Sequence, residues 1–158
     1  MPHFETTRRV RHSASDMFDL VADVEKYPQF VPLCDRLVIR DRVTVGDHPA
    51  VIADMTVAYK FLRETFTSRA VLDRDTHTII AEYLDGPFSR MNNKWTFVPR
   101  GNEACDVSFA IDYAFRSRTF EMLAGAVFDR AFRKFAAAFE ARADAIYGSK
   151  AGAAGTAA

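Results

Sequence analysis

The stretch SRTFEMLAGAVFDRAFRKFAAAFEARADAIY, residues 117–147, decides how the rest of the chain must fold. It has no proline and a single glycine, and most of its residues are good helix formers. Its apolar side chains recur at i, i+3, i+4 and i+7, which predicts one amphipathic helix, capped by Ser117 or Thr119 and ended by Gly148. Such a helix would be about 45 Å long. We therefore expect the rest of the chain to supply a large apolar surface for it.

The composition is that of a single globular domain. The 158 residues are 49% apolar and include 14 phenylalanines, and a chain of this length buries roughly 70% of its unfolded surface. The 21 basic and 21 acidic side chains cancel, so the global charge favours neither nucleic acid nor an anionic membrane, although local patches stay open. We expect one domain over residues 1–148 and a disordered tail over residues 149–158.

Cysteine usage and hydropathy indicate a cytoplasmic protein. Cys34 and Cys105 are far apart and form no CxxC pair, which predicts two reduced thiols, with a disulfide or metal pair as the alternative. No apolar run approaches the roughly 18 residues of a membrane span, and no apolar signal region follows the first methionine. Any contact with the inner face of the membrane would then be peripheral and transient.

The N-terminal part predicts a strand, two short helices and an unusual loop. Residues 3–11 are typical of a partly exposed strand, and Ser13 would cap a helix of about two turns. Another helical turn over residues 24–27 would be stopped by Pro28. The apolar segment between Pro28 and Pro32 cannot be a regular helix. Such a loop either plugs a core or forms the rim of a pocket.

From residue 36 onward the period of the apolar residues changes from 3.6 to 2, which is typical of strands. Segment 105–115 alternates most clearly, with Cys, Val, Phe, Ile, Tyr and Phe on one face. Strands at this spacing, joined by short turns, predict an antiparallel meander with one buried face. The predicted strands are 36–45, 50–60, 62–72, 76–84, 89–99 and 105–115.

This order of elements predicts an α+β fold, in which a curved antiparallel sheet of about six or seven strands carries the helices on one side. The sheet has to curl in order to cover so long a helix. A curled sheet that grips a helix commonly leaves a cavity between the two layers. The aromatic excess on the inward faces suits either an ordinary core or the wall of an apolar ligand site.

No catalytic, phosphate-binding or metal-binding motif stands in the sequence. We therefore expect no catalytic residue, no metal and no cofactor. Glu64 and Glu82 are the strongest exceptions, because a strand carboxylate facing the cavity would have a raised pKa and could act as a base. The four histidines are expected to be exposed or at edges: His3, His12, His48 and His77.

Basic residues lie on the predicted strands and on the polar side of the long helix. The ordinary interpretation is a solvated face. The more specific interpretation is that these residues contact ribosomal RNA or an anionic lipid headgroup. The residues concerned are Arg63, Arg69, Arg90, Lys94, Arg130, Arg133 and Lys134.

Four stretches carry a family resemblance that covers nearly the whole chain except its tail. They are VADVEKYPQFVPLC (21–34), KFLRETFTSRA (60–70), LDGPFSRMNNKWTF (84–97) and the strand-plus-helix pattern over 105–143. In these stretches the chain resembles the coenzyme Q-binding START-domain family, within the polyketide cyclase/lipid-transport superfamily of START-like, helix-grip proteins. YPQFVPLC together with DGPF and the NxW of residues 93–95 is the more specific part.

The resemblance implies a helix-grip fold with a hydrophobic tunnel that holds ubiquinone or a similar polyprenyl lipid. Such a protein would be a non-catalytic chaperone that supports respiratory electron transport or quinone biosynthesis. Tyr59 or Tyr113 would hydrogen-bond a quinone carbonyl, and Phe30 and Val31 would be the residues that touch a membrane. The expected tunnel residues are Phe30, Val31, Leu33, Met55, Val57, Tyr59, Trp95, Phe97, Phe109, Ile111, Tyr113, Leu123, Val127 and Phe128.

Two other functions stay open. Bacterial members of the same family resemble a ribosome-association toxin that binds the large subunit and blocks subunit joining, although zero net charge counts mildly against RNA binding. The superfamily name also suggests a polyketide cyclase, which would need polar groups inside the cavity. The inward faces supply few of these. DNA is not an expected partner.

Overall fold

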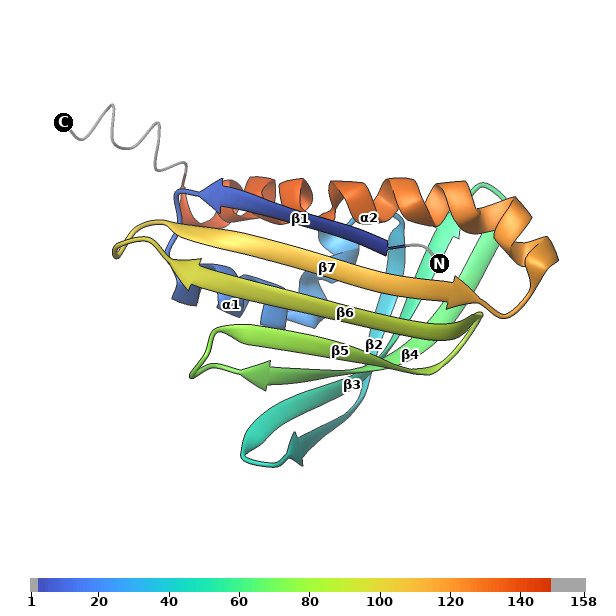
Figure 1. Cartoon of the computed structure of the whole chain (residues 1–158), viewed down its shortest axis with the longest axis horizontal. Helices are drawn as coiled ribbons and strands as arrows, with labels where there is room; N and C mark the ends of the chain where they lie inside the picture. Colours follow the sequence, from blue (N-terminus) through green and yellow to red (C-terminus); the bar gives the residue numbers. More distant parts are fainter. Residues whose placement is uncertain (1–2, 149–158) are drawn as a thin grey trace.

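The computed structural model describes residues 3–148 as a curved seven-stranded antiparallel sheet with helices on its concave side (Figure 1). This is the α+β helix-grip arrangement that the sequence predicts. The elements are β1 (His3–Val10), α1 (Ala14–Ala22), η1 (Val24–Gln29), β2 (Cys34–Val45), β3 (His48–Tyr59), β4 (Leu62–Asp73), β5 (Thr78–Asp85), β6 (Phe88–Pro99), β7 (Cys105–Phe115) and α2 (Arg118–Tyr147).

The sheet is a meander from β2 to β7, and β1 joins it beside β7, so the strand order is β1-β7-β6-β5-β4-β3-β2. The two-residue period decides which face is buried. In β7, Cys105, Val107 and Phe109 point into the core, while Asp106 between them points outward and pairs with Arg9 and Arg100. The predicted meander with one buried face is confirmed.

Helix α2 lies along the concave side of the sheet for 30 residues (Figure 1). Ser117 caps it, because its hydroxyl accepts a hydrogen bond from the backbone N–H of Phe120 at 3.1 Å. Its inner face packs large rings against the sheet. The ring of Phe139 lies 5.0 Å from that of Trp95, and the ring of Phe128 lies 5.5 Å from that of Phe88.

The short helices close one side of the core. Ser13 caps α1 by accepting from the N–H of Asp16 at 3.0 Å, as its sequence position predicts. The expected stop at Pro28 is wrong, since η1 is a 3₁₀ helix that continues to Gln29. Pro28 lies inside this short helix, where Lys26 donates to the carbonyl oxygen of Asp23 and Phe30 to that of Tyr27.

One turn depends on a glycine for both conformation and space. Gly86, between β5 and β6, has a φ of 141°, which L side chains rarely adopt. A Cβ atom added to it would lie 2.6 Å from the Cβ of Phe66 and 2.9 Å from its Cα. The DGP sequence at this turn therefore lets the chain pass directly against β4.

Two further expectations concern the ends of the chain and the membrane. The predicted disordered tail, residues 149–158, lies outside the described residues. Within residues 3–148, no helix is long and apolar enough to cross a membrane.

Candidate functional site: an apolar cavity between sheet and helix

A cavity lies between the concave face of the sheet and α2, closed at one side by η1 and the loop after it. The space in which the centre of a water molecule fits is about 100 Å³, several times the roughly 10–15 Å³ that one buried water needs. Its lining comprises Val21, Val24, Tyr27, Pro32, Leu33, Leu37, Val51, Ala53, Met55, Val57, Phe66, Ser68, Ala70, Ile79, Ala81, Met91, Asn93, Trp95, Phe109, Ile111, Phe128, Ala131, Phe132, Phe135 and Phe139.

Small side chains on the central strands create this space. Ala53, Ala70 and Ala81 face inward on β3, β4 and β5, where larger residues would reach the helix. Ala70 pairs with Ala81 across the sheet, and Ala131 on α2 is also small. Since the sheet curves away from the helix over these strands, four methyl groups leave a void that the surrounding rings do not fill.

The proline-framed loop borders the cavity. Pro32 and Leu33 are part of the lining, and Leu33 has a φ of 65°, an uncommon conformation for a leucine. The carbonyl oxygen of Leu33 accepts from the N–H of Ala58 on β3 at 3.0 Å. This bond ties the loop to the sheet and holds the leucine side chain against the cavity.

Four lining residues carry polar groups: Tyr27, Ser68, Asn93 and Trp95, whose indole N–H is a hydrogen-bond donor. Tyr27 donates its hydroxyl to the carbonyl oxygen of Val21 at 2.5 Å, and burial raises its pKa far above the usual range. Asn93 donates from Nδ2 to the carbonyl oxygen of Ala110 at 3.0 Å. The hydroxyl of Ser68 has no hydrogen-bond partner among residues 3–148. Every other wall residue is apolar, so this site suits a largely apolar molecule with few polar groups.

Half of the expected tunnel residues line this cavity. Leu33 comes from the loop, and the remaining six come from the sheet and the helix, as their alternation and helical spacing indicate: Met55, Val57, Trp95, Phe109, Ile111 and Phe128. That they contact a ligand stays a prediction.

Several expected residues lie outside the lining because they pack in the core. Phe97 stacks on Trp95 and meets Phe18 edge to face, and Tyr113 packs against Phe132 with ring centroids 5.0 Å apart. Val31 is only 5% exposed. These side chains point inward as predicted, but neighbouring side chains separate them from the open space.

Other expected residues are displaced toward the surface. Leu123 is 69% exposed, because Ala124 and Phe128 occupy the inner face of α2 at this level. Val127 and Tyr59 are partly exposed and do not line the cavity. Tyr113 is also outside the lining, and the hydrogen bond expected from Tyr59 or Tyr113 to a quinone carbonyl stays a prediction.

Phe30 lies at the surface beside the cavity but is not free. Its ring meets that of Phe139 edge to face at 5.0 Å, and the Arg142 guanidinium lies 5.1 Å from its centre. Phe30, expected in the tunnel and at a membrane, is thus part of the packing between the loop and α2.

Some lining residues were missed although the sequence signalled them. Asn93 shares its face of β6 with Met91 and Trp95, so alternation alone places it inside. Phe132 and Phe135 fall on the apolar stripe of α2. Tyr27 belongs to the family-like stretch 21–34.

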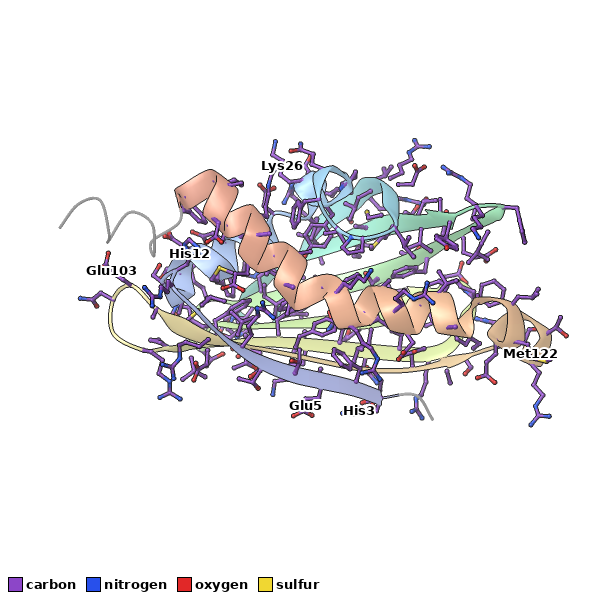
Figure 2. The ribbon with its side chains drawn as sticks, turned by 90° about the horizontal axis from the view of Figure 1, so that it is seen from above. His3, Glu5, His12, Lys26, Glu103 and Met122 are labelled. Atoms are coloured by element: carbon purple, nitrogen blue, oxygen red, sulfur yellow. The ribbon has the colours of Figure 1, made fainter. Side chains whose placement is uncertain are left out.

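The candidate bases lie elsewhere. Neither Glu64 nor Glu82 lines the cavity, and Glu82 pairs with Arg69 on the outer surface. Among the histidines, His12 contradicts the expectation of exposure. It is 0% exposed, and its Nε2 lies 2.7 Å from a carboxylate oxygen of Asp144 near the end of α2 (Figure 2). The cause is tertiary, since β1 brings His12 beneath the C-terminal part of that helix.

The cysteines and the basic residues are also placed by the fold. Cys34 and Cys105 are buried and unpaired, and burial raises the pKa of each thiol to about 11. Of the basic residues on the surface, Arg63 pairs with Asp35 at 2.7 Å and Arg133 with Asp129 at 2.9 Å.

The chain is similar to known proteins over most of its length. Residues 10–140 match the family described as polyketide cyclase / dehydrase and lipid transport. The ribosome association toxin RatA of Escherichia coli (strain K12) is 32% identical over 150 residues, 95% of this chain and 92% of that protein. The mitochondrial coenzyme Q-binding protein COQ10 homolog B of Xenopus laevis is 29% identical over 140 residues, 86% of this chain and 55% of that one.

A solved structure is similar over nearly the same range. The 18 kDa protein CC1736 from Caulobacter crescentus, whose solution structure is known, is 37% identical, with a TM-score of 0.74 over 94% of this chain and 99% of that one. This relative therefore shares the arrangement of sheet and helices.

Proposed function

Because the chain belongs to the polyketide cyclase / dehydrase and lipid transport family, we propose that it is a non-catalytic binding protein for a polyprenyl lipid, with ubiquinone as the leading candidate. The observation that carries the proposal is the apolar cavity between sheet and α2. An isoprenoid tail needs a continuous apolar wall, and each CH₂ group that leaves water contributes about 0.8 kcal/mol.

The chemistry of the wall supports binding over catalysis. Among the described residues, the one ionisable side chain in the lining is Tyr27, and its hydroxyl is already used in a hydrogen bond. The name of the Xenopus laevis relative supports coenzyme Q as the ligand. In this proposal the protein acts as a chaperone for the quinone in respiratory electron transport or in quinone biosynthesis.

The first test is an organic extraction of the protein isolated from its native host, analysed by mass spectrometry. It is matched by titration of delipidated protein with a short-tailed ubiquinone. The single tryptophan, Trp95, lines the cavity, so its fluorescence reports occupancy directly. We expect co-purified lipid and saturable quenching. A protein that extracts empty and shows no saturable change would overturn the proposal.

A matched pair of variants assigns binding to the cavity. Ala81→Phe places a ring inside the space, whereas Ala58→Phe makes the same change on a β3 residue that does not line it. We expect Ala81→Phe to lose quinone binding and Ala58→Phe to keep it, with both folded by circular dichroism. Equal binding by both variants would place the ligand elsewhere.

Association with the large ribosomal subunit is the second candidate, and the 32% identity to RatA favours it. The exposed basic residues of α2, Arg130 and Lys134, are the part of the surface proposed to meet RNA phosphates. The test is co-sedimentation with isolated large subunits at two salt concentrations. Binding that weakens with salt and in an Arg130→Glu/Lys134→Glu variant would support this function; no co-sedimentation at low salt would exclude it.

Peripheral membrane contact and cyclase activity are retained as lesser proposals. The membrane residues expected from sequence need revision, because Val31 is buried and Phe30 packs on Phe139. Vesicle flotation tests the contact directly. For the cyclase, the described lining offers only Tyr27, Ser68, Asn93 and the indole N–H of Trp95 as polar groups, and incubation with a linear polyketide thioester would test turnover.

A further inference from the structure

We propose that Asn93 fixes the polar end of the ligand, and that the cavity therefore prefers a ligand bearing a hydroxyl group, such as a phenol or a hydroquinone, over the matching ether or ketone. This inference rests on the proposed function, because it takes the cavity to be the ligand site. It names the residue that recognises the head group and the chemistry that it recognises.

The orientation of the Asn93 side chain is determined by its partner. The carbonyl oxygen of Ala110 on β7 can only accept a hydrogen bond, so the amide must turn Nδ2 toward it, and the two atoms lie 3.0 Å apart. Within residues 3–148 the amide oxygen Oδ1 receives no side-chain or backbone donor. It is not sealed off either, since Asn93 is only partly buried and lines the cavity. The wall thus presents an unpartnered amide acceptor at Asn93, in addition to the unpartnered hydroxyl of Ser68.

The surroundings of Asn93 have room for a ring. Asn93 pairs with Ala81 on β5, and Ala81 pairs with Ala70 on β4, so two methyl groups lie beside the amide on the same face of the sheet. Met91 and Trp95 flank it two residues away along β6. A six-membered ring can lie over the alanines with its edge toward the amide, while an apolar tail runs along the other walls.

The acceptor then selects among head groups. A ligand hydroxyl donates to Oδ1, and its oxygen can accept from the second N–H of the amide, so both groups are satisfied. A ketone or ether oxygen can accept from that N–H but supplies nothing to Oδ1, which is left unpaired in an apolar cavity. Tyr27 offers no alternative, because its hydroxyl is bonded to the carbonyl of Val21. The indole N–H of Trp95 is a donor only, so it cannot receive the proton of a ligand hydroxyl. The Ser68 hydroxyl is the competing group, which a Ser68→Ala variant tests.

The experiment uses two matched probes that differ in one proton donor: a 4-alkylphenol and the methyl ether of the same phenol, titrated against Trp95 fluorescence. We expect the wild-type protein to bind the phenol roughly three- to tenfold more tightly, as one hydrogen bond in such a site contributes. In Asn93→Leu this ratio should fall to about one while ether binding persists. The hydroquinone and quinone forms of a short-tailed ubiquinone, compared without oxygen, should show the same order.

Controls and outcomes separate this inference from the function on which it rests. Asn92→Leu changes the neighbouring residue on the outer face of β6 and should keep the ratio. Ser68→Ala removes the other unpartnered hydroxyl of the wall, and loss of the ratio in this variant but not in Asn93→Leu would assign the selection to Ser68 and overturn the inference. If both probes bind the wild-type protein equally, or if Asn93→Leu keeps the preference, Asn93 does not select the head group, although the cavity still binds ligand. If neither probe binds, the proposed function itself fails.

Discussion

At the scale of single residues, Tyr27 connects the cavity wall to the end of a helix. Val21 stands in the last turn of α1, where a carbonyl oxygen has no partner within the helix, and the Tyr27 hydroxyl donates to it at 2.5 Å. Tyr27→Phe removes the donor and keeps the ring contacts with Phe30 and Phe139. We expect a loss of about 1–2 kcal/mol in the free energy of unfolding, measured in urea. An unchanged midpoint would mean that water replaces the hydroxyl.

Asp106 gives stability that depends on pH. Its carboxylate accepts hydrogen bonds from Arg9 and Arg100, and the bond from Arg9 has the larger effect. Together they lower the pKa of Asp106 to about 2. A group whose pKa is depressed by folding stabilises the folded state above its unfolded pKa, near 3.9, and loses that contribution as the pH falls toward 2.

The destabilisation caused by Asp106→Asn should therefore be full at pH 6 and shrink between about pH 4 and pH 2. Melting temperatures of wild type and variant, measured across this range, check the prediction. A difference that stays constant down to pH 2 would show that the arginines do not hold the carboxylate in its charged form. Asp41→Asn, in a carboxylate outside the Arg9–Asp106–Arg100 group, serves as the control.

At the scale of elements, α2 has an inner and an outer apolar side chain near its start. Phe128 is 2% exposed and contacts Phe88 and Phe115, whereas Leu123 is 69% exposed. Phe128→Ala should reduce the free energy of unfolding by about 3–5 kcal/mol, and Leu123→Ala should change it by less than about 0.5 kcal/mol. Comparable losses in urea titrations would mean that Leu123 packs against something in solution.

The β5–β6 turn should tolerate no side chain at Gly86. An alanine there would need a φ of 141° and would place its Cβ against the backbone of Phe66. We expect Gly86→Ala to destabilise the protein by about 2–3 kcal/mol. Gly101→Ala is the matched control, because nothing lies within 4 Å of a Cβ there, although its φ is also positive. Similar losses for both variants would attribute the effect to backbone strain alone.

Elements were predictable from local periodicity, and every predicted strand boundary from residue 36 onward lies within two residues of the observed one. The two-residue period of the strands and the apolar stripe of the helix depend only on residues close in sequence, so they can be recognised in a single sequence. The site was less predictable, because a cavity forms where side chains are too small to fill the space between the sheet and α2. Ala70 and Ala81 look unremarkable in sequence, yet they open the void; Phe97 and Tyr113 look like ligand contacts, yet they complete the core.

At the scale of the whole molecule, the cavity is a departure from close packing that the fold tolerates. Protein interiors are normally as dense as organic crystals, and an apolar void forfeits dispersion contacts along its walls. Here rings of α2 pack against rings of β6 and β7 beside the cavity, so contacts are lost only along the cavity walls. A ligand that fills this space would recover those contacts and stabilise the folded state by linkage, by about 2.7 kcal/mol at a concentration one hundred times its Kd.

An empty cavity costs packing contacts but leaves room for a ligand, so a side chain that fills it should raise stability and remove binding. Ala81→Phe tests this. Because the added ring enters existing space rather than a packed core, we expect the apo variant to gain roughly 0.5–2 kcal/mol in the free energy of unfolding while it loses ligand binding. The lipid-loaded wild type and the empty variant should then melt at similar temperatures, and added quinone should raise the melting temperature of the wild type alone. Calorimetry of both forms measures this. A variant that is destabilised by about 1–3 kcal/mol, as overpacking would cause, would mean that the cavity closes in solution without a ligand.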